Sequence, residues 1–313
     1  MPNSTIGLAA AFFTVLVWTI STFSFAHASR MTHPGTVNRI RLLFAVIILT
    51  VIVCLMGSVW PWQLLQSVQS DALLYFGVSG LIGFTIGDTL FFTAFKILGS
   101  RRASIFTCVA PAAALLAGIP MLHESLSATG IVGMLISMSG ILMLSLSRKE
   151  QQEVHSEGHG VFWAGVVYAL LGAVCQGVGI VLSRKGFAAA GSGLNAVHAA
   201  WIRIFVGTTS AYLVSVRSTP PLRELSEAIA NTTLFRKLLS GTLLGPVLGV
   251  SASLLAVQYI EASIAQTILA TTPVTVTVVS ALAYKEPISR LSAFAVALSL
   301  AGVIILVWRD SLL

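Results

Sequence analysis

Two stretches of the chain carry the same pattern and decide how the fold is built: APAAALLAGIPMLHESLS, residues 110–127, and TPVTVTVVSALAYKEPIS, residues 272–289. A gap-free shift of 162 residues superimposes them and also pairs unusual residues elsewhere. The pairs are Arg41 with Arg203, Gly83 with Gly245, Gly87 with Gly249, Pro111 with Pro273, Glu124 with Glu286, Ser127 with Ser289 and Gly140 with Gly302. The sequence therefore predicts two copies of one structural pattern.

The composition indicates a membrane protein. Of the 313 residues, 56% are hydrophobic and 9% are charged, and the mean hydropathy is +0.91. A soluble protein has about 25% charged residues because its surface faces water, whereas a surface that faces lipid needs none. Lipid offers the backbone no hydrogen-bond partner, so only helices or closed barrels can span it, and long apolar runs predict helices. The net charge of +7 comes from Lys and Arg near the ends of these runs, which indicates lipid headgroups rather than nucleic acid as their partners.

Ten apolar runs are long enough to be transmembrane helices. They cover residues 6–28, 36–56, 72–95, 103–122, 127–146, 161–183, 196–216, 238–260, 264–284 and 291–308. A polar linker, residues 147–160, separates a first repeat at residues 1–146 from a second at residues 161–313. A longer connector at residues 217–237 contains PPLRELSEAI, which predicts a short surface helix.

The number of spans in each copy has a topological consequence. Five is odd, so the second copy must start from the opposite side of the membrane. The expected fold class is therefore an all-α integral membrane protein with ten transmembrane helices arranged as two inverted five-helix repeats. Inverted repeats suit alternating access, because exchanging the conformations of the two halves moves the opening to the other side. A scaffold or a passive pore with the same symmetry is the alternative.

A single carboxylate interrupts one of these runs. Asp88 lies in GLIGFTIGDTLFF, residues 80–92, and is the only charged residue between Ala72 and Phe95. A charge at mid-membrane is costly, so such residues usually face a cavity or a partner. Three roles are open: binding a cationic group of a solute, taking up a proton as a coupling group, or pairing internally to hold helices together. Its repeat equivalent is Val250, so the charge belongs to one copy only.

Aromatic and amide residues add to the candidate solute site. Phe84, Phe91 and Phe92 would share the face of Asp88 in an α-helix. An aromatic wall beside one carboxylate suits an amphipathic organic solute, and lipid-facing Phe is the alternative. Gln176 and Gln258 would add hydrogen-bonding groups at membrane depth. Small residues at every fourth position in the third and eighth spans predict close helix packing.

Three residue pairs at equivalent positions are candidates for gating or structural roles. Arg41 and Arg203 begin the second and seventh spans, where they could recognise an anionic group of a solute, form a gate ion pair, or extend to the membrane interface and bond to backbone carbonyls. Glu124 and Glu286 precede the fifth and tenth spans, where a carboxylate can satisfy free backbone N–H groups or form a gating salt bridge. Pro111 and Pro273 interrupt the fourth and ninth spans and permit kinks or hinges.

No catalytic, metal or nucleotide motif stands in a credible context. The three cysteines, Cys54, Cys108 and Cys175, match no metal-binding spacing. We expect no enzyme activity, no metal, no cofactor and no direct coupling to ATP. An integral-membrane enzyme and a non-transporting scaffold or sensor are the alternatives to a transporter.

Residues 87–144 and 256–306 resemble the EamA-like repeat of the drug/metabolite transporter superfamily. The resemblance implies ten transmembrane helices in two inverted repeats, and export or exchange of small metabolites such as amino acids or related amphipathic compounds. It also implies a central cavity formed by helices 1, 3, 4, 6, 8 and 9. The residues at matching positions are Trp18, Asp88, Pro111, Gln176, Ser253 and Pro273.

We therefore expect a secondary active transporter in the inner (cytoplasmic) membrane that works by alternating access. Its partners would be a small-molecule solute, membrane lipid and protons as the candidate coupling ion, with monomer and homodimer both open. All but four of the 18 Lys and Arg residues lie on the side of the connectors that follow odd-numbered spans; the four are Arg184, Lys185, Arg203 and Arg309. The positive-inside rule then places both termini outside the cytoplasm, whereas members of the family commonly have both termini inside.

Overall fold

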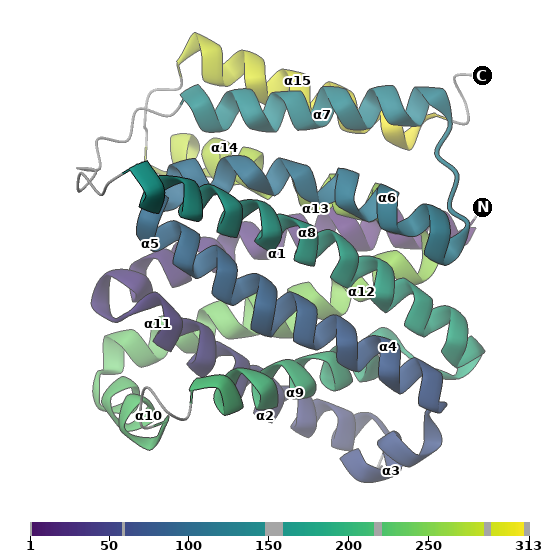
Figure 1. Ribbon diagram of the computed structural model, residues 1–313. Helices are drawn as coiled ribbons and strands as arrows, with labels where there is room; N and C mark the ends of the chain where they lie inside the picture. The colour runs from purple at the N-terminus through teal and green to yellow at the C-terminus, as the bar shows by residue number, and fades with distance from the viewer. Residues whose placement is uncertain (1, 58–59, 148–158, 216–220, 285–288, 310–313) are drawn as a thin grey trace. The chain divides into compact units, whose positions relative to one another are not determined.

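The computed structural model of the chain describes residues 2–57, 60–147, 159–215, 221–284 and 289–309, and every regular element in these ranges is helical (Figure 1). The helices belong to two compact units. The first unit consists of Met1–Ile86 and Leu182–Tyr259, and the second consists of Gly87–Val181 and Ile260–Leu313.

The first unit takes helices from the beginning of both copies. It contains α1 (Pro2–Met31), α2 (Pro34–Gly57), α3 (Pro61–Ser67), α4 (Ser70–Gly80), all but the last residue of the π-helical segment η1 (Leu81–Gly87), the end of α8 (His159–Ala190), the 3-10 turn η3 (Gly191–Gly193), α9 (Ala196–Ser215), α10 (Pro221–Ala230), α11 (Thr232–Thr242), the π-helical segment η4 (Leu243–Gly249) and α12 (Val250–Tyr259).

The second unit takes mainly the later helices of both copies. It contains α5 (Asp88–Ile105), the 3-10 turn η2 (Phe106–Val109), α6 (Ala110–Leu122), α7 (Ala128–Ser147), most of α8, α13 (Ala262–Leu269), α14 (Thr272–Tyr284) and α15 (Arg290–Val307). The compact units therefore do not coincide with the two sequence repeats. The repeat boundaries at residues 146 and 161 stay a prediction, and most of the linker lies outside the described residues.

The apolar helices follow the spans expected from the sequence. Within the described residues, seven helical stretches are long and apolar enough to cross a membrane: Asn3–Met31, Gly35–Met56, Ser70–Phe91, Val161–Ala190, Thr232–Tyr259, Ala262–Ala283 and Arg290–Val307. Phe106–Leu122 and Ala128–Leu144 are shorter apolar helices. The remaining expected span corresponds to α9, whose hydropathy is lowered by His198 and Arg203. The full count of ten stays a prediction.

In the first unit, α2 and α9 hold equivalent positions in the two copies and pack antiparallel. The Thr208 hydroxyl donates a hydrogen bond to the Leu42 carbonyl at 3.2 Å. Further back along α9, the Trp201 indole N–H donates to the Thr50 hydroxyl at 2.8 Å. Residue numbers therefore rise along α2 as they fall along α9.

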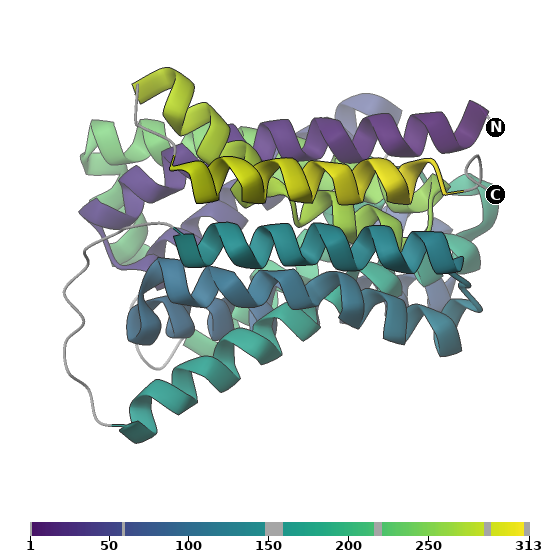
Figure 2. The same cartoon turned by 90° about the horizontal axis from the view of Figure 1, so that it is seen from above.

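In the second unit, α7 and α15 are also equivalent, and they lie side by side in both views (Figures 1 and 2). A Cβ added at Gly140 would lie 2.4 Å from the Ser299 backbone nitrogen, and one at Gly302 would lie 2.3 Å from the Ser137 nitrogen. The hydroxyls of Ser137 and Ser299, which are repeat equivalents, are 3.4 Å apart. The two contacts are copies of each other, so a local two-fold axis relates the antiparallel helices.

Candidate functional site

Asp88 is the first residue of α5 and is buried, with 9% of its surface exposed. The side-chain amide of Gln176, on α8, donates a hydrogen bond to its Oδ1 atom at 3.2 Å. One turn further along α5, the ring of Phe91 is buried against α8, where a Cβ at Gly172 would lie 2.8 Å from it. The structure thus brings together three predicted site residues, Asp88, Phe91 and Gln176, which we call the carboxylate site.

Helix α6 packs on the same part of α8. A Cβ added at Gly177, next to Gln176, would lie 2.5 Å from the Ala110 carbonyl oxygen. Phe91, Ala110 and Ala173 form one buried apolar cluster. The carboxylate site is therefore built from α5, α8 and α6, and it combines one carboxylate, one amide and an apolar wall.

The aromatic face expected around Asp88 is interrupted. The expectation assumed an α-helical period from Phe84 onward, but Leu81–Gly87 is π-helical. Phe84 instead packs in the first unit, where a Cβ at Gly207 on α9 would lie 2.9 Å from its side chain. Phe92 follows in α5, and its side chain lies outside the described residues.

The two prolines lie in the first turns of helices that follow breaks in the fourth and ninth spans, so both spans are interrupted there, and a hinge role stays a prediction. Pro111 lies in the first turn of α6, directly after the 3-10 turn η2. Pro273 lies in the first turn of α14, after α13 has ended at Leu269. The hydroxyls of Thr271 and Thr272 donate to the carbonyls of Ile268 and Leu269 at 2.6 and 2.7 Å, so the carbonyls freed at this break are satisfied.

Glu124 is buried and caps a helix, but not the one expected from its position in the sequence. Its Oε1 atom accepts a hydrogen bond from the Ala262 backbone N–H at 2.8 Å. Its Oε2 atom accepts from the N–H and the hydroxyl of Ser263 at 3.5 and 3.3 Å. The carboxylate thus satisfies the free N–H groups at the start of α13 rather than those of α7. Glu286 lies outside the described residues.

Both predicted arginines lie well inside their helices, rather than at the helix starts, and face aromatic rings of the first unit. The Arg203 guanidinium of α9 is 4.9 Å from the centroid of the Phe84 ring, and the residue is 4% exposed. The Arg41 guanidinium of α2 is 5.6 Å from the Phe25 ring centroid, and its Nε donates to the Asn38 side-chain oxygen at 2.8 Å. Cation–π contact therefore accompanies both residues.

The remaining candidates also belong to the first unit and do not form one cluster. Trp18 of α1 packs against η4, where a Cβ at Gly249 would lie 2.2 Å from its indole nitrogen. The Ser253 hydroxyl donates to the Val250 carbonyl at 2.8 Å within α12. The Gln258 amide donates to the Leu194 carbonyl at 3.4 Å. Ser253 and Gln258 thus bond to backbone groups.

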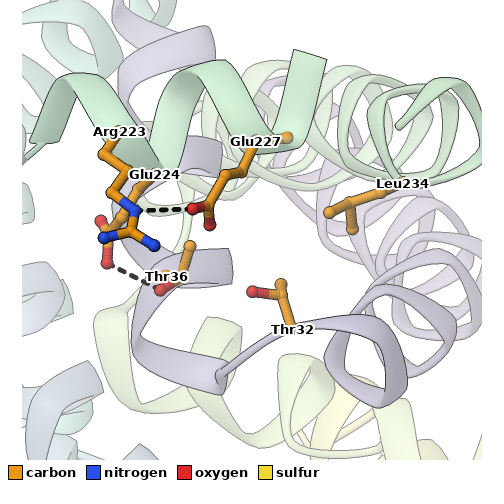
Figure 3. Close-up of a pocket in the computed structure, with 7 residues that line it drawn as sticks. Thr32, Thr36, Arg223, Glu224, Glu227 and Leu234 are labelled. Atoms are coloured by element: carbon orange, nitrogen blue, oxygen red, sulfur yellow. Dashed lines mark hydrogen bonds and ion pairs between the residues drawn. The ribbon is translucent and has the colours of Figure 1, made fainter. Parts of the chain in front are cut away.

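A pocket of about 260 Å³ lies elsewhere in the first unit, beside α10, which forms where the sequence predicted a surface helix (Figure 3). Glu224 accepts a hydrogen bond from the Thr36 hydroxyl at 2.8 Å and forms an ion pair with Arg39. Arg223 donates to Glu227 at 2.8 Å, and this bond and the charge of Glu227 raise the pKa of Arg223. None of the residues that line it is a predicted site residue, and its charged surface position fits a connector better than a solute site.

One class of helical segment was not anticipated from the sequence, and the described residues offer no metal cluster. Among the residues that the structure describes, no group of three or more His, Cys, Asp and Glu side chains could hold a metal ion. The π-helical segments η1 and η4 were missed, although Gly83, Gly87, Gly245 and Gly249 mark them in the sequence and Pro246 lies inside η4. Pro246 cannot donate a helical hydrogen bond, so it was the available signal.

One comparison with known proteins identifies a family. The model of the EamA-like transporter family matches the chain twice, over residues 5–146 and 163–308. No curated protein matches the sequence significantly. A solved structure titled only "Crystal structure of protein" is similar to the chain with a TM-score of 0.76 and 18% sequence identity, and the match covers 96% of each chain. At this identity the likeness concerns the fold alone.

Proposed function

The chain belongs to the EamA-like transporter family, and from that premise we propose that it is a secondary active transporter that exports or exchanges small organic metabolites. The family match confirms the resemblance predicted from the sequence, and the chain is a multi-pass membrane protein. The proposed solutes are amino acids or related amphipathic compounds, the proposed membrane is the inner (cytoplasmic) membrane, and the proposed mechanism is alternating access.

The contacts between equivalent helices support ten spans in two inverted repeats. Both α2–α9 and α7–α15 pair an element of one copy with its equivalent in the other, and both pairs are antiparallel. Antiparallel equivalents are what inverted copies require, whereas two copies of the same topology would place equivalent helices parallel.

Contacts between connectors support the same topology. In a ten-span chain, the connectors after spans 1 and 7 lie on one side of the membrane. Thr36, after the first span, contacts Glu224, after the seventh. On the other side, Glu124 before the fifth span contacts Ala262 before the ninth. Each contact joins two connectors that alternation places on the same side.

The carboxylate site is the observation that carries the functional proposal. Asp88 is buried and accepts a hydrogen bond from the side-chain amide of Gln176. A buried carboxylate beside an amide and an apolar ring suits recognition of a cationic group or uptake of a proton. Its equivalent position holds Val250, so the fold does not need a carboxylate there. We assign Asp88 to solute binding or proton coupling, and Gln176 and Phe91 to the same site.

The test is solute flux in proteoliposomes with and without a pH gradient, after a metabolite panel has been screened for thermal stabilisation of the purified protein. Asp88→Asn preserves the shape and can still accept from Gln176, so it should fold normally and reduce flux by about tenfold or more. Asp71→Asn, which changes an exposed carboxylate on α4, is the matched control and should leave flux unchanged. Flux that ignores the gradient, or that survives in Asp88→Asn, removes the coupling role.

The orientation is proposed from the charge count, with both termini outside the cytoplasm. A reporter that is active only in the cytoplasm, fused after Leu313, tests it. A weak signal is expected. A strong signal would establish the orientation that family members commonly have.

A further inference from the structure

Two π-helical segments lie at equivalent positions of the two copies, and the first of them directly precedes Asp88. η1 covers Leu81–Gly87 and η4 covers Leu243–Gly249, seven residues each, and a shift of 162 residues superimposes their limits. Both run into α-helix on either side without a loop. π-Helical turns are rare, and they concentrate at functional sites. Because both copies contain the same rare turn, a packing requirement at a single place in the molecule does not explain it.

Each π segment is held by close contact with a neighbouring helix. In η1, a Cβ at Gly83 would lie 2.9 Å from the Arg203 guanidinium. In η4, a Cβ at Gly245 would lie 2.5 Å from the Ser21 hydroxyl, and one at Gly249 would lie 2.2 Å from the Trp18 indole nitrogen. The neighbouring atoms in these contacts belong to side chains, which can move if the segment changes conformation. The backbone of both segments is rich in glycine, the residue with the least restricted backbone.

The helix interfaces on both sides of the two segments follow one register. Before η1, the hydroxyls of Ser79 and Ser183 are 2.7 Å apart; the equivalent contact before η4 is the Ser21 hydroxyl donating to the Gly241 carbonyl at 2.9 Å. After η1, Gln176 donates to Asp88, the first residue beyond the segment.

The corresponding contact of the second copy lies at the last residue of η4, one position before Val250, the equivalent of Asp88. Thr14, the equivalent of Gln176, lies with its hydroxyl 3.5 Å from the carbonyl of Gly249, the last residue of the segment. The π segments therefore set which residue faces α8 in one copy and α1 in the other. In the first copy, the residue so placed is the carboxylate of the candidate site.

We propose that η1 and η4 are paired register switches, and that conversion of η1 to α-helix is the step that moves Asp88 away from Gln176 during transport. The proposal rests on the proposed transport function. A π turn holds one more residue than an α turn, so conversion rotates the helix beyond the segment by about one residue, or about 100°. Packed helices favour such discrete steps over gradual bending. Solute or proton binding at Asp88 drives the step by favouring one register over the other.

Two disulfide locks on the α8 interface test the proposal in a variant without Cys54, Cys108 and Cys175. The lock before η1 is Ser79→Cys with Ser183→Cys, and the lock after it is Leu98→Cys with Gly165→Cys, where a Cβ would lie 2.8 Å from the Leu98 side chain. Either lock alone leaves the chain between them free, so flux should stay within about twofold of the reduced protein. Both locks together hold η1 at both ends and should reduce flux by about tenfold or more, reversibly on reduction.

A matched pair of locks on a helix pair without a π segment provides the control. Ser137→Cys with Ser299→Cys, and Gly133→Cys with Leu306→Cys, join α7 to α15, and both together should leave flux unchanged. Flux that persists in the double-locked protein overturns the switch. Flux stopped by a single lock also overturns it, because α8 would then have to slide as a whole. Absence of flux in the reduced protein would instead count against the proposed transport function.

Hydrogen exchange in the unmodified protein gives a second, independent measurement. Amides of residues 81–87 and 243–249 should exchange faster than those of α7, and solute should change the protection of one segment more than that of the other. Protection equal to that of α7 in both segments, with and without solute, would contradict the proposal even if the cysteine variants fail to fold.

Discussion

Two helix interfaces in the molecule have the same register and different chemistry. In the second unit, α8 meets α5 through Gln176 and Asp88; in the first unit, α1 meets η4 and α12 through Thr14 and Gly249, beside Val250. The shared register means that packing fixes the backbone contact in both copies. The different side chains mean that packing does not require a charge. The comparison thus separates what the fold needs from what one copy adds to it.

The largest expected effect comes from placing a carboxylate at the position of the second copy that is equivalent to Asp88. Val250 is 5% exposed, and Val250→Asp would bury a carboxylate beside a Thr hydroxyl instead of an amide. We expect a loss of about 3–5 kcal/mol of stability, seen as a lower midpoint of thermal unfolding in detergent.

The reverse change sharpens the comparison. Asp88→Val should leave the unfolding midpoint unchanged or higher while reducing flux by about tenfold or more. Adding Thr14→Gln to Val250→Asp supplies the missing amide and should recover part of the lost stability. If Val250→Asp is as stable as the native protein, the two interfaces are chemically interchangeable and the assignment of Asp88 loses its basis.

Removing the Glu124 carboxylate should have the next largest effect. Glu124→Ala leaves the N–H groups of Ala262 and Ser263 at the start of α13 without this acceptor, and a buried donor without a partner costs about 1–3 kcal/mol. Glu124→Gln keeps one acceptor oxygen and should lose less. Glu227→Ala, an exposed site with a side chain 64% exposed, is the control for thermal unfolding. Equal midpoints for Glu124→Ala and Glu227→Ala would contradict the capping role.

Sequence reasoning located the helices better than it located their contacts. The apolar runs predicted the helix ranges, because burial in lipid imposes length and hydropathy directly on the sequence. The 162-residue shift revealed the repeat. The partner of Glu124 could not be predicted, because Ala262 lies far along the chain and only tertiary packing brings its N–H group near. The prediction that Phe84 shares a helix face with Asp88 was wrong for a local reason, because a π-helical segment breaks the α-helical period on which it relied.

The candidate site was predicted in part for the same physical reason. A lone carboxylate in an apolar run is visible in the sequence because of its cost, and so are amides at membrane depth. Which amide would meet Asp88 was not visible, since Gln176 and Gln258 looked alike. The mixing of both copies in each compact unit was not visible either, since it depends on how the chain folds in space.

Because a local two-fold axis relates α7 and α15, their equivalent glycines should respond equally to substitution. Gly140→Ala and Gly302→Ala each place a methyl group against backbone of the other helix, which must move away at a cost of about 1–3 kcal/mol. The two losses should agree to within about 0.5 kcal/mol. Gly193→Ala, with no atom within 4 Å of the added methyl group, is the control. Clearly unequal losses would contradict the symmetry.

The smallest effect concerns the two connector helices, which the same shift also makes equivalent. α3 (Pro61–Ser67) follows Trp60 and contains Trp62, both about two-thirds exposed at 65% and 66%, as suits a membrane interface. α10 carries charges instead and is held to α2 by the ion pair between Arg39 and Glu224.

A double-mutant cycle of Arg39→Gln and Glu224→Gln measures what that ion pair contributes. The two side chains are 17% and 12% exposed, so water screens their attraction only partly, and we expect a coupling energy of about 1 kcal/mol. A cycle on Arg223 and Glu227, exposed at 77% and 64%, should give no measurable coupling. High salt should weaken the first coupling only modestly. If the two cycles give the same result, burial does not distinguish the pairs, and α10 is not held to α2 by charge.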